Sequence, residues 1–150
     1  IDFVKSFASG VIFTTSMMPS VAAAATKSIE IVENLEEERL DIFSKANYFK
    51  QKLEFAEIPF IDSNSHIIPI LTYSTERAKI YSKLLLERYN CYIQPIFYPT
   101  VPEGSARLRI TITPKHSKND IDQLTVALIK IFDIHNLKEK DTRTTHHQVA

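Results

Sequence analysis

The sequence has a single cysteine and no net charge at neutral pH. Cys91 cannot form an internal disulfide, and its apolar, aromatic neighbours favour a buried, inert thiol in a reducing compartment. Eighteen basic residues balance eighteen acidic ones, which excludes a chain-wide field that would attract DNA, RNA or an anionic membrane. Any anion-binding site must therefore be local.

Long hydrophobic runs and several common motifs are also missing. No apolar run approaches the roughly 20 residues that cross a bilayer, so we expect a soluble protein without a membrane span. The sequence contains no P-loop, no GxGxxG pattern and no zinc-binding spacing. His66 is interpreted as a capping or core histidine, and the pair His146 and His147 has no metal-ligand companions. We therefore predict no metal site.

The 150 residues, of which 44% are hydrophobic, are enough for a globular core of modest size. Apolar spacing and capping residues predict four helices. The first covers about residues 19–34, and the second begins at Glu36 and ends before Pro59. The third is capped by Ser74 or Thr75, and the fourth begins at a capping box that starts with Ser117. Short β-branched or alternating runs predict strands over 67–71, 92–97 and 107–113, with Pro69 indicating an edge strand or a bulge. This pattern predicts an α+β fold in which helices cover one face of a small sheet.

Two segments of the sequence can bind an anion. Residues 107–113 alternate, so that Arg109 lies on the polar face of a strand, where a guanidinium can hold a carboxylate with two hydrogen bonds. The alternative is that Arg109 is simply an exposed charge on an open sheet face. Without further information, the strand pattern favours this alternative. The hydroxyl run Thr14, Thr15 and Ser16 precedes a helix that begins near Pro19, which suits either a phosphate site or an ordinary helix cap.

Four segments, in this order, resemble the C-terminal part of the α-oxoamine synthases, which are pyridoxal-phosphate (PLP) enzymes of fold type I. The segments are Val-Ile-Phe-Thr-Thr-Ser at 11–16, Ser-His-Ile-Ile-Pro at 65–69, Tyr-Pro-Thr-Val-Pro-Glu-Gly at 98–104 and Arg-Leu-Arg-Ile-Thr at 107–111. Within the family, the first and third segments are most similar to the 5-aminolevulinate synthases. The 8-amino-7-oxononanoate synthases share a similar loop and strand, and Met17-Met18 departs from the usual leucine-proline.

The resemblance implies a PLP-dependent acyltransferase that condenses glycine with succinyl-CoA to 5-aminolevulinate, CoA and CO2 in haem biosynthesis. It implies a homodimer in which Thr14 and Thr15 contact the PLP phosphate across the subunit interface. It also implies that Thr100 lies near the acyl group of succinyl-CoA and that Arg109 holds the glycine carboxylate. The compartment would be the cytoplasm in a bacterium and the mitochondrial matrix in a eukaryote.

The family's cofactor-binding lysine lies upstream of the hydroxyl run, before Ile1, and neither Lys5 nor Lys27 stands in the matching motif. No catalytic residue is therefore assigned to this chain, and we expect it to be inactive without an N-terminal half. A non-catalytic binding or dimerising module is the alternative of a different class. We expect residues 1–34 to be the end of the large PLP domain and its connecting helix, 35–136 the small C-terminal domain, and 137–150 a disordered polar tail.

Overall fold

The computed structural model describes residues 1–8, 10 and 17–146, with side chains up to residue 133. The chain divides into two compact units, Ile1–Glu36 and Glu37–Ala150. This division falls two residues after the boundary predicted between residues 34 and 35. That the first unit is the end of a larger PLP domain remains a prediction.

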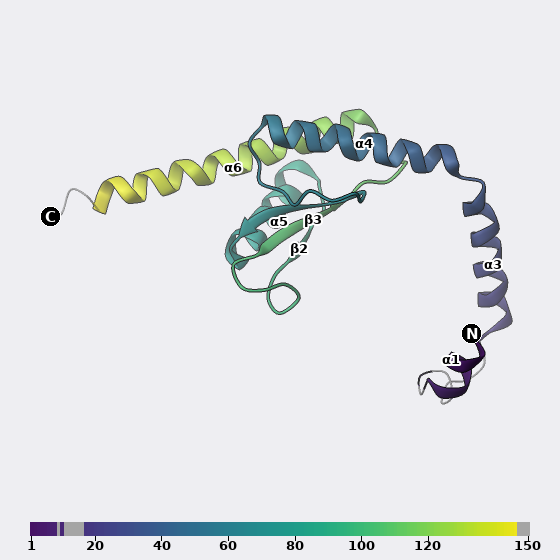
Figure 1. Ribbon diagram of the computed structural model, residues 1–150. Helices are drawn as coiled ribbons and strands as arrows, with labels where there is room; N and C mark the ends of the chain where they lie inside the picture. Colours follow the sequence, from purple (N-terminus) through teal and green to yellow (C-terminus); the bar gives the residue numbers. More distant parts are fainter. Residues whose placement is uncertain (9, 11–16, 147–150) are drawn as a thin grey trace. The chain divides into compact units, whose positions relative to one another are not determined.

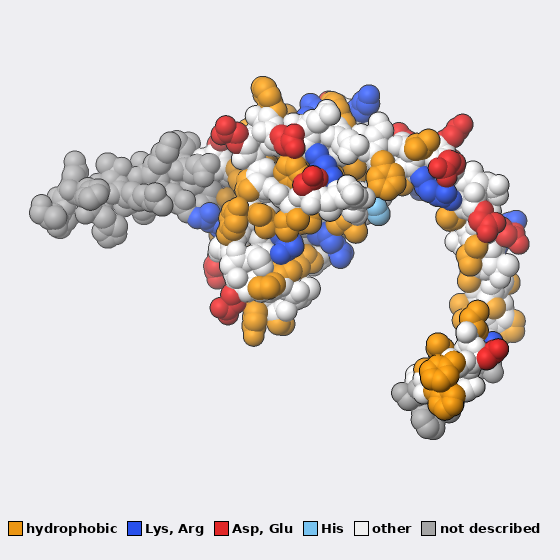
Figure 2. Space-filling model, in the orientation of Figure 1, with side chains coloured by type: hydrophobic (Ala, Val, Ile, Leu, Met, Phe, Trp, Pro, Cys, Tyr) orange, Lys and Arg blue, Asp and Glu red, His pale blue; other side chains and the backbone are white. Residues whose placement is uncertain are grey.

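The described part of the first unit contains helices α1 (Asp2–Phe7) and α3 (Pro19–Glu33). Proline stands at the first position of α3, where its missing N–H costs nothing. The residue that caps α3 is Met18, whose side chain makes no capping hydrogen bond, and the predicted Ser16 lies outside the described residues. Neither helix buries a residue, and hydrophobic side chains are exposed over the unit (Figure 2). The large exposed ones are Ile1, Phe3, Val4, Phe7, Met17, Met18, Val21, Ile29, Ile31 and Val32.

The second unit combines three helices with a three-stranded sheet (Figure 1). Its elements in chain order are α4 (Glu36–Phe55), β1 (Ile67–Tyr73), α5 (Thr75–Tyr89), β2 (Gln94–Ile96), β3 (Ala106–Thr111) and α6 (Lys118–His146). The strand order is β1-β3-β2, and both neighbouring pairs are antiparallel. The α+β prediction is confirmed, and β1, which contains Pro69, is an edge strand as predicted.

One face of the sheet is buried and the other is open. Along β3, Leu108 and Ile110 are buried while Arg109 and Thr111 are exposed, as the alternating sequence predicts. Helix α5 contacts all three strands, and buried residues of α4 and α6 belong to the same core. The largest fully buried side chains of this core are Phe49, Leu53, Ile68, Ile70, Leu85, Leu108, Ile121 and Leu128.

The predicted caps of α5 and α6 form as the sequence indicates. The Ser74 hydroxyl accepts the backbone N–H of Arg77 at 3.4 Å and begins α5. At the start of α6, the Asp120 carboxylate accepts the backbone N–H of Ser117 at 2.8 Å, and the Ser117 hydroxyl accepts that of Asp120 at 3.2 Å. This reciprocal pair is a capping box with aspartate in the glutamate position.

Helical spacing identifies the helices correctly, but it does not identify all of their buried residues. Helical spacing favours Leu40 and Phe43 for the buried face of α4, and Ile80 for that of α5, but all three are exposed. The buried residue between Ala46 and Leu53 is Phe49 instead. Periodicity identifies an amphipathic helix, whereas burial also requires an element opposite each turn, and that depends on the tertiary fold.

The last helix is longer than predicted. The backbone of α6 remains helical to His146, where a loose tail was expected from residue 137. Leu137, Lys138, Glu139, Lys140 and Arg143 in this stretch all have high helix propensity. None of the described helices is both long and apolar enough to cross a membrane.

Candidate functional site

Arg109 lies at the centre of the open face of the sheet. It is on the middle strand β3, with Pro69 of β1 and Gln94 of β2 as its register partners. The Arg109 side chain is exposed and makes no hydrogen bond or ion pair within the described part of the chain. A flat, charged fork on a rigid strand is therefore available to a carboxylate ligand.

Arg107 faces the same side two residues earlier, but its environment differs. It is half-buried, and its Nε donates a hydrogen bond to the backbone oxygen of Ser105 at 3.0 Å. This bond ties its guanidinium to the end of the preceding loop. Of the two arginines, Arg109 is thus the one that can offer all its donors to a ligand.

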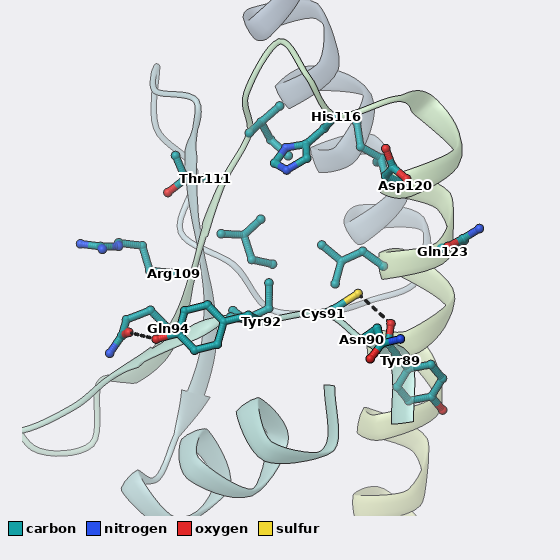
Figure 3. Close-up of a pocket in the computed structure, with 15 residues that line it drawn as sticks. Tyr89, Asn90, Cys91, Tyr92, Gln94, Arg109, Thr111, His116, Asp120 and Gln123 are labelled. Carbon is teal, nitrogen blue, oxygen red and sulfur yellow. Dashed lines mark hydrogen bonds between the residues drawn. The ribbon is translucent and has the colours of Figure 1, made fainter. Parts of the chain in front are cut away.

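A hollow of about 540 Å³ opens beside Arg109 (Figure 3). It forms where the chain before β2 diverges from β3 and where the start of α6 makes a further wall. In the close-up, Arg109 and Thr111 extend from one side of β3, while His116 and Asp120 lie toward α6. The lining residues share an apolar floor and a polar rim: Tyr89, Asn90, Cys91, Tyr92, Ile93, Gln94, Arg109, Ile110, Thr111, Ile112, His116, Asp120, Ile121, Gln123 and Leu124.

The titratable groups near α6 have structural partners. The backbone N–H of Ser117, followed by its hydroxyl, holds the pKa of Asp120 below its usual range, because both hydrogen bonds favour the carboxylate. Burial, with a smaller contribution from Asp120, raises the pKa of the Cys91 thiol. The His116 Nδ1 accepts the backbone N–H of Thr113 at 3.1 Å. Cys91 is therefore a neutral thiol rather than a nucleophile. Of the residues that line the hollow, Arg109 is best suited to an anion, and its side chain extends from β3 on the side away from α6 (Figure 3).

Thr100 lies in the loop that joins β2 to β3. Its backbone N–H donates to the oxygen of Phe97 at 3.0 Å, and the N–H of Ser105 donates to the oxygen of Pro102 at 3.2 Å. Gly104 has a φ of 76°, which glycine adopts without the steric cost of a Cβ. The exposed Thr100 thus belongs to the same β-hairpin as Arg109, although no hydrogen bond joins the two side chains in the described structure.

The predicted phosphate ligands Thr14 and Thr15 lie outside the described residues. Their convergence with Arg109 therefore remains a prediction. The described residues also contain no cluster of side chains that could hold a metal ion. Sequence reasoning missed Gln94, the partner of Arg109 on β2. The sequence shows a polar residue between Ile93 and Pro95, but only the register of the hairpin pairs this residue with Arg109.

Comparisons with known proteins identify the family of this chain. Residues 1–128 match the family model of the class I and II aminotransferases. A 5-aminolevulinate synthase of Bradyrhizobium diazoefficiens is 44% identical over 133 residues, covering 89% of this chain and 32% of the relative. That of Rickettsia prowazekii is 38% identical and covers all of this chain and 37% of the relative. A mitochondrial 5-aminolevulinate synthase of Debaryomyces hansenii is 42% identical, covering 89% of this chain and 23% of the relative.

Solved structures support the fold. A serine palmitoyltransferase variant from S. paucimobilis with a bound PLP–myriocin aldimine has a TM-score of 0.82 at 24% identity, covering 91% of this chain and 34% of that one. An 8-amino-7-oxononanoate synthase from Francisella tularensis has a TM-score of 0.76 at 20% identity, covering 90% of this chain and 39% of that one.

The chain spans about a third of the length of the bacterial relatives that it matches. The predicted resemblance to α-oxoamine synthases is confirmed by these matches, and the solved structures share the fold that the resemblance implies. The chain belongs to the class I and II aminotransferase family, within which the curated relatives it resembles are 5-aminolevulinate synthases.

Proposed function

We propose that this chain is the C-terminal part of a 5-aminolevulinate synthase and that Arg109 holds the carboxylate of glycine. The observation that carries the proposal is the unpaired guanidinium on the middle strand of the open sheet face. The complete enzyme condenses glycine with succinyl-CoA and releases 5-aminolevulinate, CoA and CO2. The identity to curated 5-aminolevulinate synthases supports this choice of reaction.

The described residues fit one end of the substrate better than they fit the cofactor. A PLP site needs an available lysine, whereas the half-buried lysines here are engaged. Lys45 contacts Asp41 at 2.6 Å and the backbone oxygen of Pro114 at 2.7 Å, and Lys50 contacts Asp62 at 2.8 Å. Neither Lys45 nor Lys50 is free to attach PLP, and Lys5 and Lys27 do not stand in the family's lysine motif, so the chain offers a carboxylate anchor but not the family's attachment point for PLP.

When bound, PLP supplies the electron sink that makes the α-carbon of glycine acidic. The residues of this chain have other tasks. Arg109 fixes the carboxylate and so orients the α-carbon, Thr14 and Thr15 bind the phosphate from across a dimer interface, and Thr100 contacts the acyl end of succinyl-CoA. The isolated chain is inactive, because the lysine that binds the cofactor and moves protons comes from a preceding part of the protein.

The exposed apolar side chains of the first unit fit a chain that is one part of a larger enzyme. Helix α3 buries nothing by itself, so it packs on the large PLP domain in the complete enzyme. The enzyme works in the cytoplasm if its source is bacterial and in the mitochondrial matrix if it is eukaryotic. Bacterial and mitochondrial relatives both occur among the matches.

The test replaces Arg109 in the complete protein, in which this chain is joined to the lysine-bearing part. Arg109→Leu should weaken glycine binding by about 2 to 5 kcal/mol, because the carboxylate loses its charged partner. Arg109→Lys should recover part of the loss, since lysine keeps the charge but not the fork. Arg88→Leu, at an exposed arginine on α5, is the matched control. Unchanged glycine saturation in Arg109→Leu would remove Arg109 from this role.

A second measurement tests the need for the missing part. The chain alone, mixed with PLP, should show no visible absorbance of protein-bound cofactor and no product. Addition of the lysine-bearing half should restore both. Colour or turnover from the chain alone would contradict the proposal, and restored saturation by alanine but not glycine would favour an 8-amino-7-oxononanoate synthase. Association without colour or turnover would instead point to a non-catalytic dimerising module.

A further inference from the structure

We infer that Gln94 is a second ligand of the carboxylate that Arg109 binds, and that Tyr92 positions the Gln94 side chain. The inference rests on the proposed function, because it assigns additional residues to the same substrate group. It concerns residues of the strand β2 and the segment just before it, neither of which the motif resemblance assigns to the site.

The sheet register places Gln94 beside Arg109. The two residues are direct partners in the antiparallel β2–β3 ladder, and direct partners point to the same face with their Cβ atoms about 5 Å apart. Both side chains are exposed on the open face and line the same hollow, as Tyr92 does (Figure 3). On its other flank, Arg109 is paired with Pro69, whose side chain has no polar atom. Gln94 is thus the polar cross-strand neighbour of this guanidinium.

The Gln94 amide is held in one orientation. Its Oε1 accepts the phenol O–H of Tyr92 at 2.8 Å. This hydrogen bond occupies the amide oxygen and fixes which side of the amide group carries it. Its Nε2 donates to the backbone oxygen of Pro95 at a long 3.4 Å. An amide nitrogen has two N–H bonds, so one donor remains without a partner in the described structure. Tyr92 thereby fixes which atom of the amide is available to a ligand.

This arrangement suits an acceptor-only ligand such as a carboxylate. Two carboxylate oxygens provide about four acceptor positions, of which a guanidinium fork fills two. A neutral amide N–H can fill a third without competing for the positive charge of Arg109. A carboxylate side chain at position 94 would instead form an ion pair with Arg109 and exclude the substrate. The neutral Gln94 therefore keeps the site available and contributes to its preference for a carboxylate.

The experiment measures binding of glycine and of methylamine to the complete PLP-loaded protein by spectral titration. Methylamine reports amine binding without a carboxylate. Gln94→Ala should weaken glycine binding roughly tenfold and Tyr92→Phe roughly threefold, as expected for hydrogen bonds to a charged group, with methylamine binding little changed. Tyr92→Phe should have no further effect in the Gln94→Ala background, because it acts through Gln94. Gln94→Glu, which preserves the shape, should weaken glycine binding more than Gln94→Ala does.

The variants separate this inference from the proposed function. If Arg109→Leu leaves glycine binding unchanged, the proposed function fails. If Arg109→Leu weakens it while Gln94→Ala and Gln94→Glu do not, only the role of Gln94 is overturned. An equal loss for glycine and methylamine in Gln94→Ala would also overturn it, because a general disturbance of the fold affects both ligands. Gln51→Ala, at an exposed glutamine of α4, serves as the control, and Gln94→Glu and Tyr92→Phe retain the test if Gln94→Ala fails to fold.

Discussion

Replacing Leu108 with alanine should destabilise the second unit strongly, whereas replacing its neighbour Arg109, which lies on the open face, should not. Leu108 is fully buried on the middle strand, with Ile70 and Pro95 as its cross-strand partners. A leucine-to-alanine change in a core costs about 2 to 5 kcal/mol, and the upper half applies where the surroundings cannot collapse. Here the backbone on both sides is held by sheet hydrogen bonds, so we expect a loss of about 3 to 4 kcal/mol.

Urea unfolding of the chain, followed by far-ultraviolet circular dichroism, measures this loss. With a slope of about 1.5 to 2 kcal/mol per molar urea, the midpoint should fall by about 2 M. Arg109→Leu is the matched control, because it alters the adjacent residue on the open face and should change stability by no more than about 0.5 kcal/mol. Similar shifts for both variants, or a shift for Leu108→Ala below about 0.5 M, would refute the assignment of the two faces.

Four further predictions concern the capping box of α6, the loop between β2 and β3, and Cys91. Ser117→Ala should cost about 1 kcal/mol in urea unfolding, because it removes one half of the α6 capping box. The lowered pKa of Asp120 means that its share of this stability is complete above the unfolded pKa, near about 4, and is lost as pH falls through the lower folded pKa. Asp120→Asn should lack this acid-dependent loss, and an unchanged pH profile would contradict it. Gly104→Ala should cost about 1 kcal/mol through its positive φ alone, since nothing lies near the added Cβ, and should raise the KM for succinyl-CoA if Thr100 contacts that substrate. Cys91 should react with iodoacetamide more slowly in the folded than in the urea-unfolded chain, because burial raises the pKa of its thiol, and mass spectrometry measures both rates.

Much of the second unit was predictable from local patterns. Alternation in residues 107–113 identified β3 and the face on which Arg109 lies, because a strand places successive side chains on opposite sides. Ser74 and the Ser117–Asp120 pair marked the starts of α5 and α6, since side-chain oxygens there satisfy free backbone N–H groups. These features depend on neighbours within a few residues, so the sequence alone carries them.

Burial along the helices was less predictable. Phe43 and Phe49 are both aromatic residues of α4, yet Phe43 is exposed and Phe49 is fully buried. Helical periodicity alone did not distinguish them, because the difference lies in which turn of the helix has the sheet and α6 beneath it. The strand predicted over residues 92–97 is also shorter in the structure, because only Gln94–Ile96 pair with β3. Pairing depends on the neighbouring strand, which the local sequence does not show.

The sequence by itself determined the family, the α+β class and the face of the strand on which Arg109 lies, because motifs, alternation and caps are properties of short segments. Only the tertiary structure decided that Arg109 is free while Arg107 is tied to Ser105, and that Gln94 lies beside Arg109. The first fact follows from the local geometry of the loop end, where Ser105 lies two residues before Arg107, and the second from strand register, which pairs residues 15 positions apart. Register depends on the packing of the whole sheet, and no local pattern of residues expresses it.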